Sequence, residues 1–314
     1  MVVWWILLAL VVAGALCVAY GVLIERRWYR TVRYRLDILP TGTARTPKAG
    51  TSAPLTVLHL SDLHFARGDR RMTAYLARLP QPDVTVVTGD LVGEPEAIEA
   101  VVGALRPVRG RVASYFVLGS NDHFVTPRWV SLNWLKYFSK TRTLRVARRG
   151  RAPELIAALE ADGWTSLRNE RIVTDLAGIP AEVVGLDDPH IAWHDLRVAP
   201  RRAADRFGLA IVHSPDAAPE LAALGYDLIL SGHTHGGQVR LPLVGALVTN
   251  SVMPTRLVSG LIRFGPSYLY TSPGIGTNRF APFRFLCRPE VAYLDLQPSA
   301  GRTSGERSQA VTRS

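Results

Sequence analysis

The segment Leu228-Ile229-Leu230-Ser231-Gly232-His233-Thr234-His235 runs directly from large aliphatic residues into two histidines. An apolar run of this kind predicts a strand that is buried on both faces, and the glycine predicts the turn at its end. Neutral imidazole is a ligand for divalent transition metals. The segment therefore predicts metal-binding histidines at the end of a buried strand.

Other apolar runs along the chain end in the same way. Residues 55–60, 84–87, 115–118, 181–186 and 209–212 lead into Asp62-Leu63-His64, Gly89-Asp90, Gly119-Ser120-Asn121, Asp187-Asp188 and His213. Helical patterns at residues 71–79, 94–105 and 153–161 lie between these runs, and a last strand is expected at 291–296. Strands that alternate with helices indicate an α/β architecture. Ligands of such sheets bind beyond the carboxyl ends of the strands, where these polar groups lie.

In this order the polar groups resemble the motifs of the calcineurin-like metallophosphoesterases, which are D-x-H, GD, GN-H, a lone His and GH-x-H. The resemblance covers about residues 55–296. Residues 232–238, followed by Leu241-Pro242, look like the membrane-anchored bacterial branch of the family. The resemblance implies a four-layer αββα sandwich, with two mixed β-sheets face to face and helices outside.

The resemblance also implies a site for two divalent metal ions. Asp90 would bridge the two ions; Asp62, His64 and His235 would bind one of them, and Asn121, His213 and His233 the other. Mixed histidine and carboxylate ligands fit Mn, Fe or Zn better than Mg or Ca, and the sequence does not choose among these three metals. The reaction implied is in-line attack on phosphorus by a metal-bound hydroxide.

The residues after the ligand asparagine depart from the family pattern. The family has a histidine directly after this asparagine, which assists the leaving oxygen, whereas here Asp122 follows Asn121 and His123 comes next. A carboxylate beside two cations is expected to have a lowered pKa, which would make Asp122 a poor proton donor. The extra residue Ser120 favours an altered turn in which His123 takes the role. The candidate catalytic residues are Asn121, Asp122 and His123, and the choice of proton donor stays open.

The first 24 residues carry no charged side chain and are long enough to cross a bilayer as a helix. Trp4, Trp5 and Tyr20 near the two ends fit an aromatic belt. The absence of a basic segment before the apolar run argues against a cleaved signal peptide. We expect a transmembrane anchor at 1–24, a basic juxtamembrane segment and linker at 25–53, the catalytic domain at 54–297 and a disordered tail at 298–314.

The net charge of +11 is concentrated in two places. Arginines at 26–35 follow the anchor, and residues 128–151 hold eight basic residues, no acidic one, and the aromatic residues Trp129, Trp134, Tyr137 and Phe138. This placement favours contact with anionic lipid headgroups over nucleic-acid binding. By the positive-inside rule it favours a cytoplasmic domain at the cell membrane, with an extracytoplasmic domain as the alternative.

Four other residues have both a functional and a structural interpretation. His59 alternates with the ligand face and is expected in the core or behind the ligands. His190 and His194 would either face the substrate or belong to a solvated loop in which an aspartate caps a turn. Arg279 would either meet a phosphate or lie at the surface.

Together these features predict a membrane-anchored phosphoesterase that hydrolyses a phosphodiester or pyrophosphate bond. Its substrate would be lipid-linked or nucleotide-linked, such as a cell-envelope precursor. A phosphomonoesterase of the same fold and a non-catalytic scaffold are the alternatives, and the seven filled ligand positions argue against the scaffold. The sequence does not indicate the oligomeric state.

Overall fold

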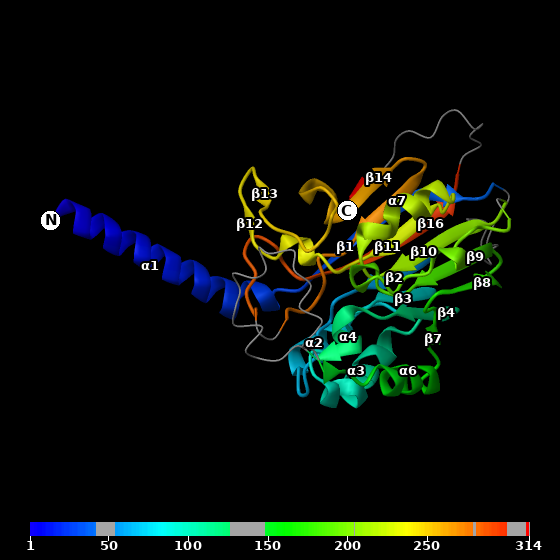
Figure 1. The fold of residues 1–314 in the computed structure, drawn as a ribbon, viewed down its shortest axis with the longest axis horizontal. Coiled ribbons are helices and arrows are strands. Elements are labelled where there is room, and N and C mark those ends of the chain that lie inside the picture. The colour runs from blue at the N-terminus through cyan, green and yellow to red at the C-terminus, as the bar shows by residue number, and fades with distance from the viewer. Residues whose placement is uncertain (42–53, 126–147, 204, 279–280, 300–311, 314) are drawn as a thin grey trace.

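The computed structural model describes residues 1–41, 54–125, 148–203, 205–278, 281–299 and 312–313. Figure 1 shows two β-sheets stacked face to face, helices outside them, and one long helix that projects away from the sheets. Both sheets mix parallel and antiparallel pairs. The predicted four-layer αββα sandwich is confirmed.

The first sheet has seven strands, and its parallel part carries three of the predicted motifs. In spatial order the strands are β17 (Thr312–Arg313), β1 (Arg30–Leu39), β16 (Glu290–Pro298), β2 (Leu55–Leu60), β3 (Val84–Thr88), β4 (Ala113–Val117) and β7 (Thr165–Ser166). Strands β2, β3, β4 and β7 are parallel to one another, so their carboxyl ends lie at one edge of the sheet.

The second sheet has six strands and carries the remaining motifs. Its order is β14 (Gly260–Phe264), β15 (Ser267–Thr271), β11 (Leu228–Ser231), β10 (Phe207–Val212), β9 (Pro180–Leu186) and β8 (Glu170–Asp175). The four central strands are parallel. Two small hairpins, β5 (Phe124–Val125) with β6 (Arg148–Arg149) and β12 (Arg240–Leu241) with β13 (Gly245–Ala246), lie outside the two sheets.

Alternate residues of the central strands pack into different apolar layers. In β2, Val57 belongs to the core between the two sheets, whereas Leu58 and Leu60 pack under the helices of the first sheet. These helices are α2 (Arg70–Leu76), α3 (Ile98–Leu105) and α6 (Ala152–Ala161), and α7 (Ala218–Ala223) covers the second sheet. Burial on both faces explains why the strand sequences are almost continuously apolar.

The N-terminal helix α1 (Val2–Leu23) is long and apolar enough to cross a membrane. The short helix η1 (Glu25–Arg27) follows it, and β1 begins three residues later at Arg30. Strand β1 pairs in parallel with β16 from Arg30 to Leu39, so the expectation that residues 25–53 only connect the anchor to the domain is corrected. The sequence did not indicate this strand, because arginines alternate with its apolar residues.

Several expectations concern residues outside the described ranges. Residues 42–53 of the expected linker, 128–147 of the basic block, Arg279 and most of the tail belong to them. The part of the tail at Thr312–Arg313 is described and pairs with β1 as β17, which corrects the expectation of disorder for these two residues.

Candidate metal centre

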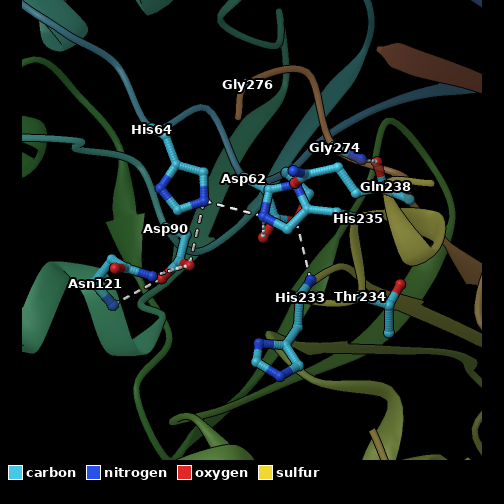
Figure 2. Close-up of polar contacts among 12 residues, drawn as sticks. Asp62, His64, Asp90, Asn121, His233, Thr234, His235, Gln238, Gly274 and Gly276 are labelled. Carbon is cyan, nitrogen blue, oxygen red and sulfur yellow. Dashed lines mark hydrogen bonds and ion pairs between the residues drawn. The ribbon is translucent and has the colours of Figure 1, made fainter. Parts of the chain in front are cut away.

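The seven predicted ligands lie at the carboxyl ends of parallel strands, and both sheets contribute. Asp62 and His64 follow β2, Asp90 follows β3, Asn121 lies in α4 (Ser120–His123) after β4, His213 follows β10, and His233 and His235 follow β11. The open edges of the two stacked sheets thus present their polar turns to one another. Figure 2 shows six of these side chains converging from different segments.

Five of the seven ligand residues have a left-handed backbone conformation. The φ angles are 49° for Asp62, 41° for His64, 51° for Asp90, 67° for His233 and 48° for His235. Left-handed φ costs a non-glycine residue about 1–2 kcal/mol, so the surrounding structure must hold these turns in place. Such strain commonly marks functional sites, because it aims a side chain where a relaxed turn would not.

One half of the cluster joins Asp62, His64 and His235. Nε2 of His64 and Nε2 of His235 are 3.1 Å apart, and Nε2 of His235 lies 3.6 Å from Oδ1 of Asp62 (Figure 2). Oδ1 of Asp62 is buried without a hydrogen-bond partner. Oδ2 of the same carboxylate accepts hydrogen bonds from Ser61 Oγ (2.6 Å) and His233 N (3.0 Å). The hydrogen bonds to Oδ2 hold the carboxylate in place, and Oδ1 faces the imidazole of His235.

The other half joins His213, His233 and Asn121 through Asp90. Nε2 of His213 lies 3.6 Å from Oδ1 of Asp90 and 3.3 Å from Nδ1 of His233. Asn121 donates from its backbone N to Oδ1 of Asp90 (2.9 Å) and from its side chain to Oδ2 (2.5 Å).

Backbone carbonyls orient two of the histidines. Nδ1 of His213 lies 2.6 Å from Thr88 O, and Nε2 of His233 lies 3.0 Å from Asn250 O. A ring nitrogen that donates to a carbonyl leaves the opposite nitrogen with a lone pair, which is the form that binds a metal. The free nitrogens, Nε2 of His213 and Nδ1 of His233, are the pair that face each other.

Burial and mutual charge set the protonation of these groups. Burial, reinforced by neighbouring positive charge, lowers the pKa of His233 and of His235 well below the usual value, so both are neutral. Burial acts against the charge of His213, but Asp90 and other nearby carboxylates outweigh it and raise the pKa of His213 to about 10. Burial also raises the pKa of Asp62. Asp90 is buried as well, but the histidines around it outweigh the effect of burial and lower the pKa of Asp90.

This donor set fits two divalent cations. Two imidazole nitrogens 3.1 Å apart repel each other through their lone pairs unless a proton or a cation lies nearby, and the unpartnered oxygen of Asp62 needs positive charge as well. The groups Asp62, His64, His235 and Asp62, Asp90, His213 each bring three ligand atoms within 4.8 Å of one another. Histidine nitrogens mixed with carboxylate oxygens suit first-row transition metals and zinc.

The motif glycine Gly119 gives the cluster its close packing. A Cβ atom at Gly119 would collide with Oδ1 of Asp90 and would lie 2.7 Å from the ring of His213. Any side chain at this position would therefore push the two sheets' ligands apart.

The structure separates the two candidate proton donors. Oδ1 of Asp122 accepts from Leu91 N (2.8 Å) and Val92 N (3.1 Å), and its Oδ2 accepts from Gly119 N (3.0 Å). Burial, followed by the charge of Asp90, raises the pKa of Asp122 to about 7 in the chain without bound cations, whereas the expected lowering concerns the carboxylate beside two cations. Through these three hydrogen bonds from backbone amides, Asp122 connects the turns that follow β3 and β4.

His123 lies in a buried polar chain. Its Nε2 lies 2.9 Å from Oδ1 of Asp187, and Oδ2 of Asp187 accepts from Nη2 of Arg168 (2.7 Å). The ring also packs edge-on against Trp193, with the centroids 4.7 Å apart. These contacts fix the orientation of the imidazole.

The loop after β9 contributes residues whose role the sequence left open. Asp188 is buried, its Oδ1 accepts from His190 N (2.8 Å), and its Oδ2 has no partner. Burial raises the pKa of Asp188 to about 6, and the ring of His190 lies 4.4 Å from that of His233. Asp188 therefore caps a turn and also borders the metal centre. The signal was present in the sequence, because Asp187-Asp188 ends an apolar run as the ligands do.

Two further residues, His59 and Arg284, lie behind the ligands, and the sequence indicated only the first. His59 is buried, as expected, and its Nε2 lies 2.8 Å from Thr88 Oγ1. The fully buried Arg284 donates from Nη2 to Gly276 O (2.6 Å) and approaches Nδ1 of His235 at 3.4 Å. Nothing in the local sequence around Arg284 indicated this position.

Comparison with known proteins agrees with this geometry. The model of the calcineurin-like phosphoesterase family matches residues 55–237. Metallophosphoesterase YkuE of Bacillus subtilis is 30% identical over 76% of this chain and 76% of its own. Phosphodiesterase YaeI of Escherichia coli is 28% identical over 87% and 90%. UDP-2,3-diacylglucosamine pyrophosphatase LpxG of Chlamydia trachomatis is 23% identical over 76% and 83%.

Proposed function

This chain belongs to the calcineurin-like phosphoesterase family and is a phosphoric ester hydrolase, and we therefore propose that it cleaves a phosphodiester or pyrophosphate bond with two divalent cations held by the seven strand-end ligands. The observation that carries this proposal is the position of Asp90. Its Oδ2 lies 3.6 Å from Nε2 of His64, and its Oδ1 lies 3.6 Å from Nε2 of His213. One carboxylate thus faces both halves of the ligand cluster.

Two bound cations would supply a nucleophilic water near neutral pH and would stabilise charge on the phosphoryl oxygens. The residues of the chain prepare this chemistry. Asp90 holds the amide of Asn121, which leaves Oδ1 of Asn121 for a cation. With cations bound, the contacts to Thr88 O and Asn250 O would direct Nε2 of His213 and Nδ1 of His233 toward the centre.

We assign proton donation to the leaving oxygen to His123. Its partner Asp187 is itself paired with Arg168, so the imidazole is held in one orientation. A proton donor must be held in a fixed position near the leaving oxygen, and this pairing provides a fixed position for the ring. Asp122 is the weaker candidate, because all of its described hydrogen bonds are to backbone amides.

The favoured substrate is lipid-linked. The relatives include a phosphodiesterase and a pyrophosphatase that acts on a diacylated sugar nucleotide, and α1 would hold the domain at a bilayer. The basic residues that follow α1 favour the cytoplasmic face. A nucleotide-linked substrate is the second candidate within the same reaction class.

The test is hydrolysis of bis(p-nitrophenyl) phosphate by the full-length protein in detergent with added Mn²⁺. We expect Asp90→Ala and His233→Ala each to lower kcat/KM by about 10³-fold or more, because each removes a ligand from the cation that activates water. Bound metal, measured by elemental analysis, should fall in both variants. Asp37→Ala, at an exposed position of β1 outside the cluster, is the control and should keep wild-type rates.

Two outcomes would contradict the proposal. Unchanged turnover and metal content in both ligand variants would show that these residues hold no catalytic cation. A much faster reaction with p-nitrophenyl phosphate than with the diester would instead identify a phosphomonoesterase.

A further inference from the structure

A cavity of about 610 Å³ lies between the end of α1, the beginning of α2, residues 275–277 and Pro282. Its lining includes Arg26 and Arg27, which come directly after α1, and also His64 of the metal centre. Ligand sites of proteins commonly have volumes of this order. The cavity therefore connects the point where the apolar helix ends with the ligand cluster.

Five arginines line this cavity, and we call it the arginine groove: Arg26, Arg27, Arg67, Arg70 and Arg71. Among the described residues, the single carboxylate in the lining is Asp69, which accepts a hydrogen bond from Met72 N (3.0 Å) as the cap of α2. Nε of Arg26 is buried and has no hydrogen-bond partner among the residues that the structure describes. The groove thus concentrates positive charge that a bound anion would neutralise.

The arginines of the groove differ from their neighbours on β1. Arg30 pairs with Glu290, and Arg33 pairs with Asp295 at 2.8 Å. Across the described ranges, none of the five groove guanidinium groups takes part in an ion pair of this kind. Arg26 is partly buried, and burial with the adjacent Arg27 lowers its pKa. Unpaired guanidinium groups around one cavity indicate an anionic ligand, for which arginine offers bidentate hydrogen bonds.

The groove is fixed relative to the end of α1. Oε1 and Oε2 of Glu25 accept hydrogen bonds from Cys287 N (2.6 Å) and Leu286 N (2.9 Å). Gly21 packs so closely on Phe283 that a Cβ atom would collide with its ring. With 22 residues, α1 is about 33 Å long, close to the ~30 Å of a bilayer core. Arg26 and Arg27 therefore lie at the level of the lipid headgroups when α1 spans a bilayer.

We propose that the arginine groove binds the phosphate-bearing headgroup of an anionic lipid that remains in the bilayer while its phosphoester reaches the metal centre. This inference rests on the proposed function and assigns the substrate class. A water-soluble ester would approach the ligands from solvent and would gain nothing from cations placed at the exit of a membrane helix.

The experiment measures equilibrium binding to the full-length protein in neutral detergent by titration calorimetry. The probes are dihexanoyl phosphatidic acid, dihexanoyl phosphatidylcholine and inorganic phosphate. We expect phosphatidic acid to bind most tightly, and the double variant R70Q/R71Q to weaken this binding about tenfold through the loss of charge-assisted hydrogen bonds. R35Q/R78Q is the matched control, because it removes two exposed arginine charges outside the groove and should keep the wild-type Kd.

R70K/R71K should recover part of the affinity, and thermal unfolding shows whether each variant is folded. Equal Kd values for R70Q/R71Q and R35Q/R78Q would overturn the proposal. Inorganic phosphate binding as tightly as phosphatidic acid would also overturn it, in favour of a site for free phosphate, and equal binding of phosphatidylcholine would show that charge is not recognised. Because binding requires no turnover, a wild-type protein inactive on the diester would refute the proposed function separately.

Discussion

At the scale of single residues, the site depends on side chains that are aimed by strained turns. Asp62, Asp90 and His233 all have positive φ, and each lies directly beyond a buried strand. The cost of these conformations is offset by packing elsewhere, since the strands before them are almost wholly buried. A ligand position in this chain therefore requires both the right side chain and a fixed backbone.

His123 provides a prediction at the same scale. Its replacement by alanine should slow hydrolysis of a diester with an alkyl leaving group by about 100-fold, because an alkoxide needs a proton as it leaves. Hydrolysis of bis(p-nitrophenyl) phosphate should change by less than about threefold, since nitrophenolate leaves without one. The measurement is kcat/KM for both esters.

Asp37→Ala, at an exposed position of β1, is the control for this prediction. Asp187→Asn should reproduce part of the loss with the alkyl ester, because Asp187 holds His123 at 2.9 Å. An equal loss of kcat/KM with both esters in His123→Ala would show a structural role for His123. Asp122 would then again be the candidate proton donor.

At the scale of elements, β1 joins the apolar helix α1 to the first sheet. Val32, Tyr34, Leu36 and Leu39 of this strand are buried in the core between the sheets. Full burial of such side chains stabilises a fold by roughly 1.5–3 kcal/mol each, so β1 contributes about 6–12 kcal/mol before entropy is counted. Without it, β16 would also lose a partner along its length.

Two truncations test the contribution of β1. A chain beginning at Arg30 lacks the apolar helix but keeps the strand, and we expect it to be soluble and cooperatively folded. A chain beginning at Pro54 lacks β1 and should aggregate or melt at a much lower temperature, because β16 becomes an unpaired edge. Thermal unfolding by circular dichroism and size-exclusion chromatography compare the two. Equal stability would show that residues 30–39 only connect the helix to the domain.

At the scale of the whole molecule, the ligand cluster lies where the two sheets meet. Asp62, His64, Asp90 and Asn121 come from the first sheet, and His213, His233 and His235 from the second. Bound cations would therefore link the two halves of the sandwich. The groove beside them is fixed to the end of α1, so one frame holds the membrane helix, the groove and the centre.

Metal removal should accordingly lower global stability. A cation at 100 times its Kd stabilises the folded state by about 2.7 kcal/mol, which corresponds to roughly 5–11 °C in a domain of this size. We expect a chelator to lower the melting temperature of the wild type by at least this amount, and added Mn²⁺ to restore it. The variant Asp90→Ala should show no response to either treatment. A chelator response of equal size in Asp90→Ala would place the stabilising metal elsewhere.

The sequence by itself determined the local part of this protein. Apolar runs predicted the central strands to within two residues at either end. Strands that are buried on both faces, such as those at 55–60 and 228–230, consist almost entirely of apolar residues. The order of the polar motifs predicted the seven ligands and identified the family, because that order can be read from the sequence alone. Strands β8, β14 and β15 and the sheet role of β1 were not predicted, since polar or half-exposed residues interrupt their pattern.

Only the tertiary structure decided which distant residues meet. Asp122 turned out to bind backbone amides, Asp187 to hold His123, and Arg284 to support His235 across 49 positions of sequence. The arginine groove brings together residues 26–27, 67–71, 275–277 and Pro282, none of which belongs to a motif. The physical reason is that the burial of a strand determines which residue types it contains, so the sequence reveals it. The residues that surround a turn depend instead on how the two sheets and the helix pack together.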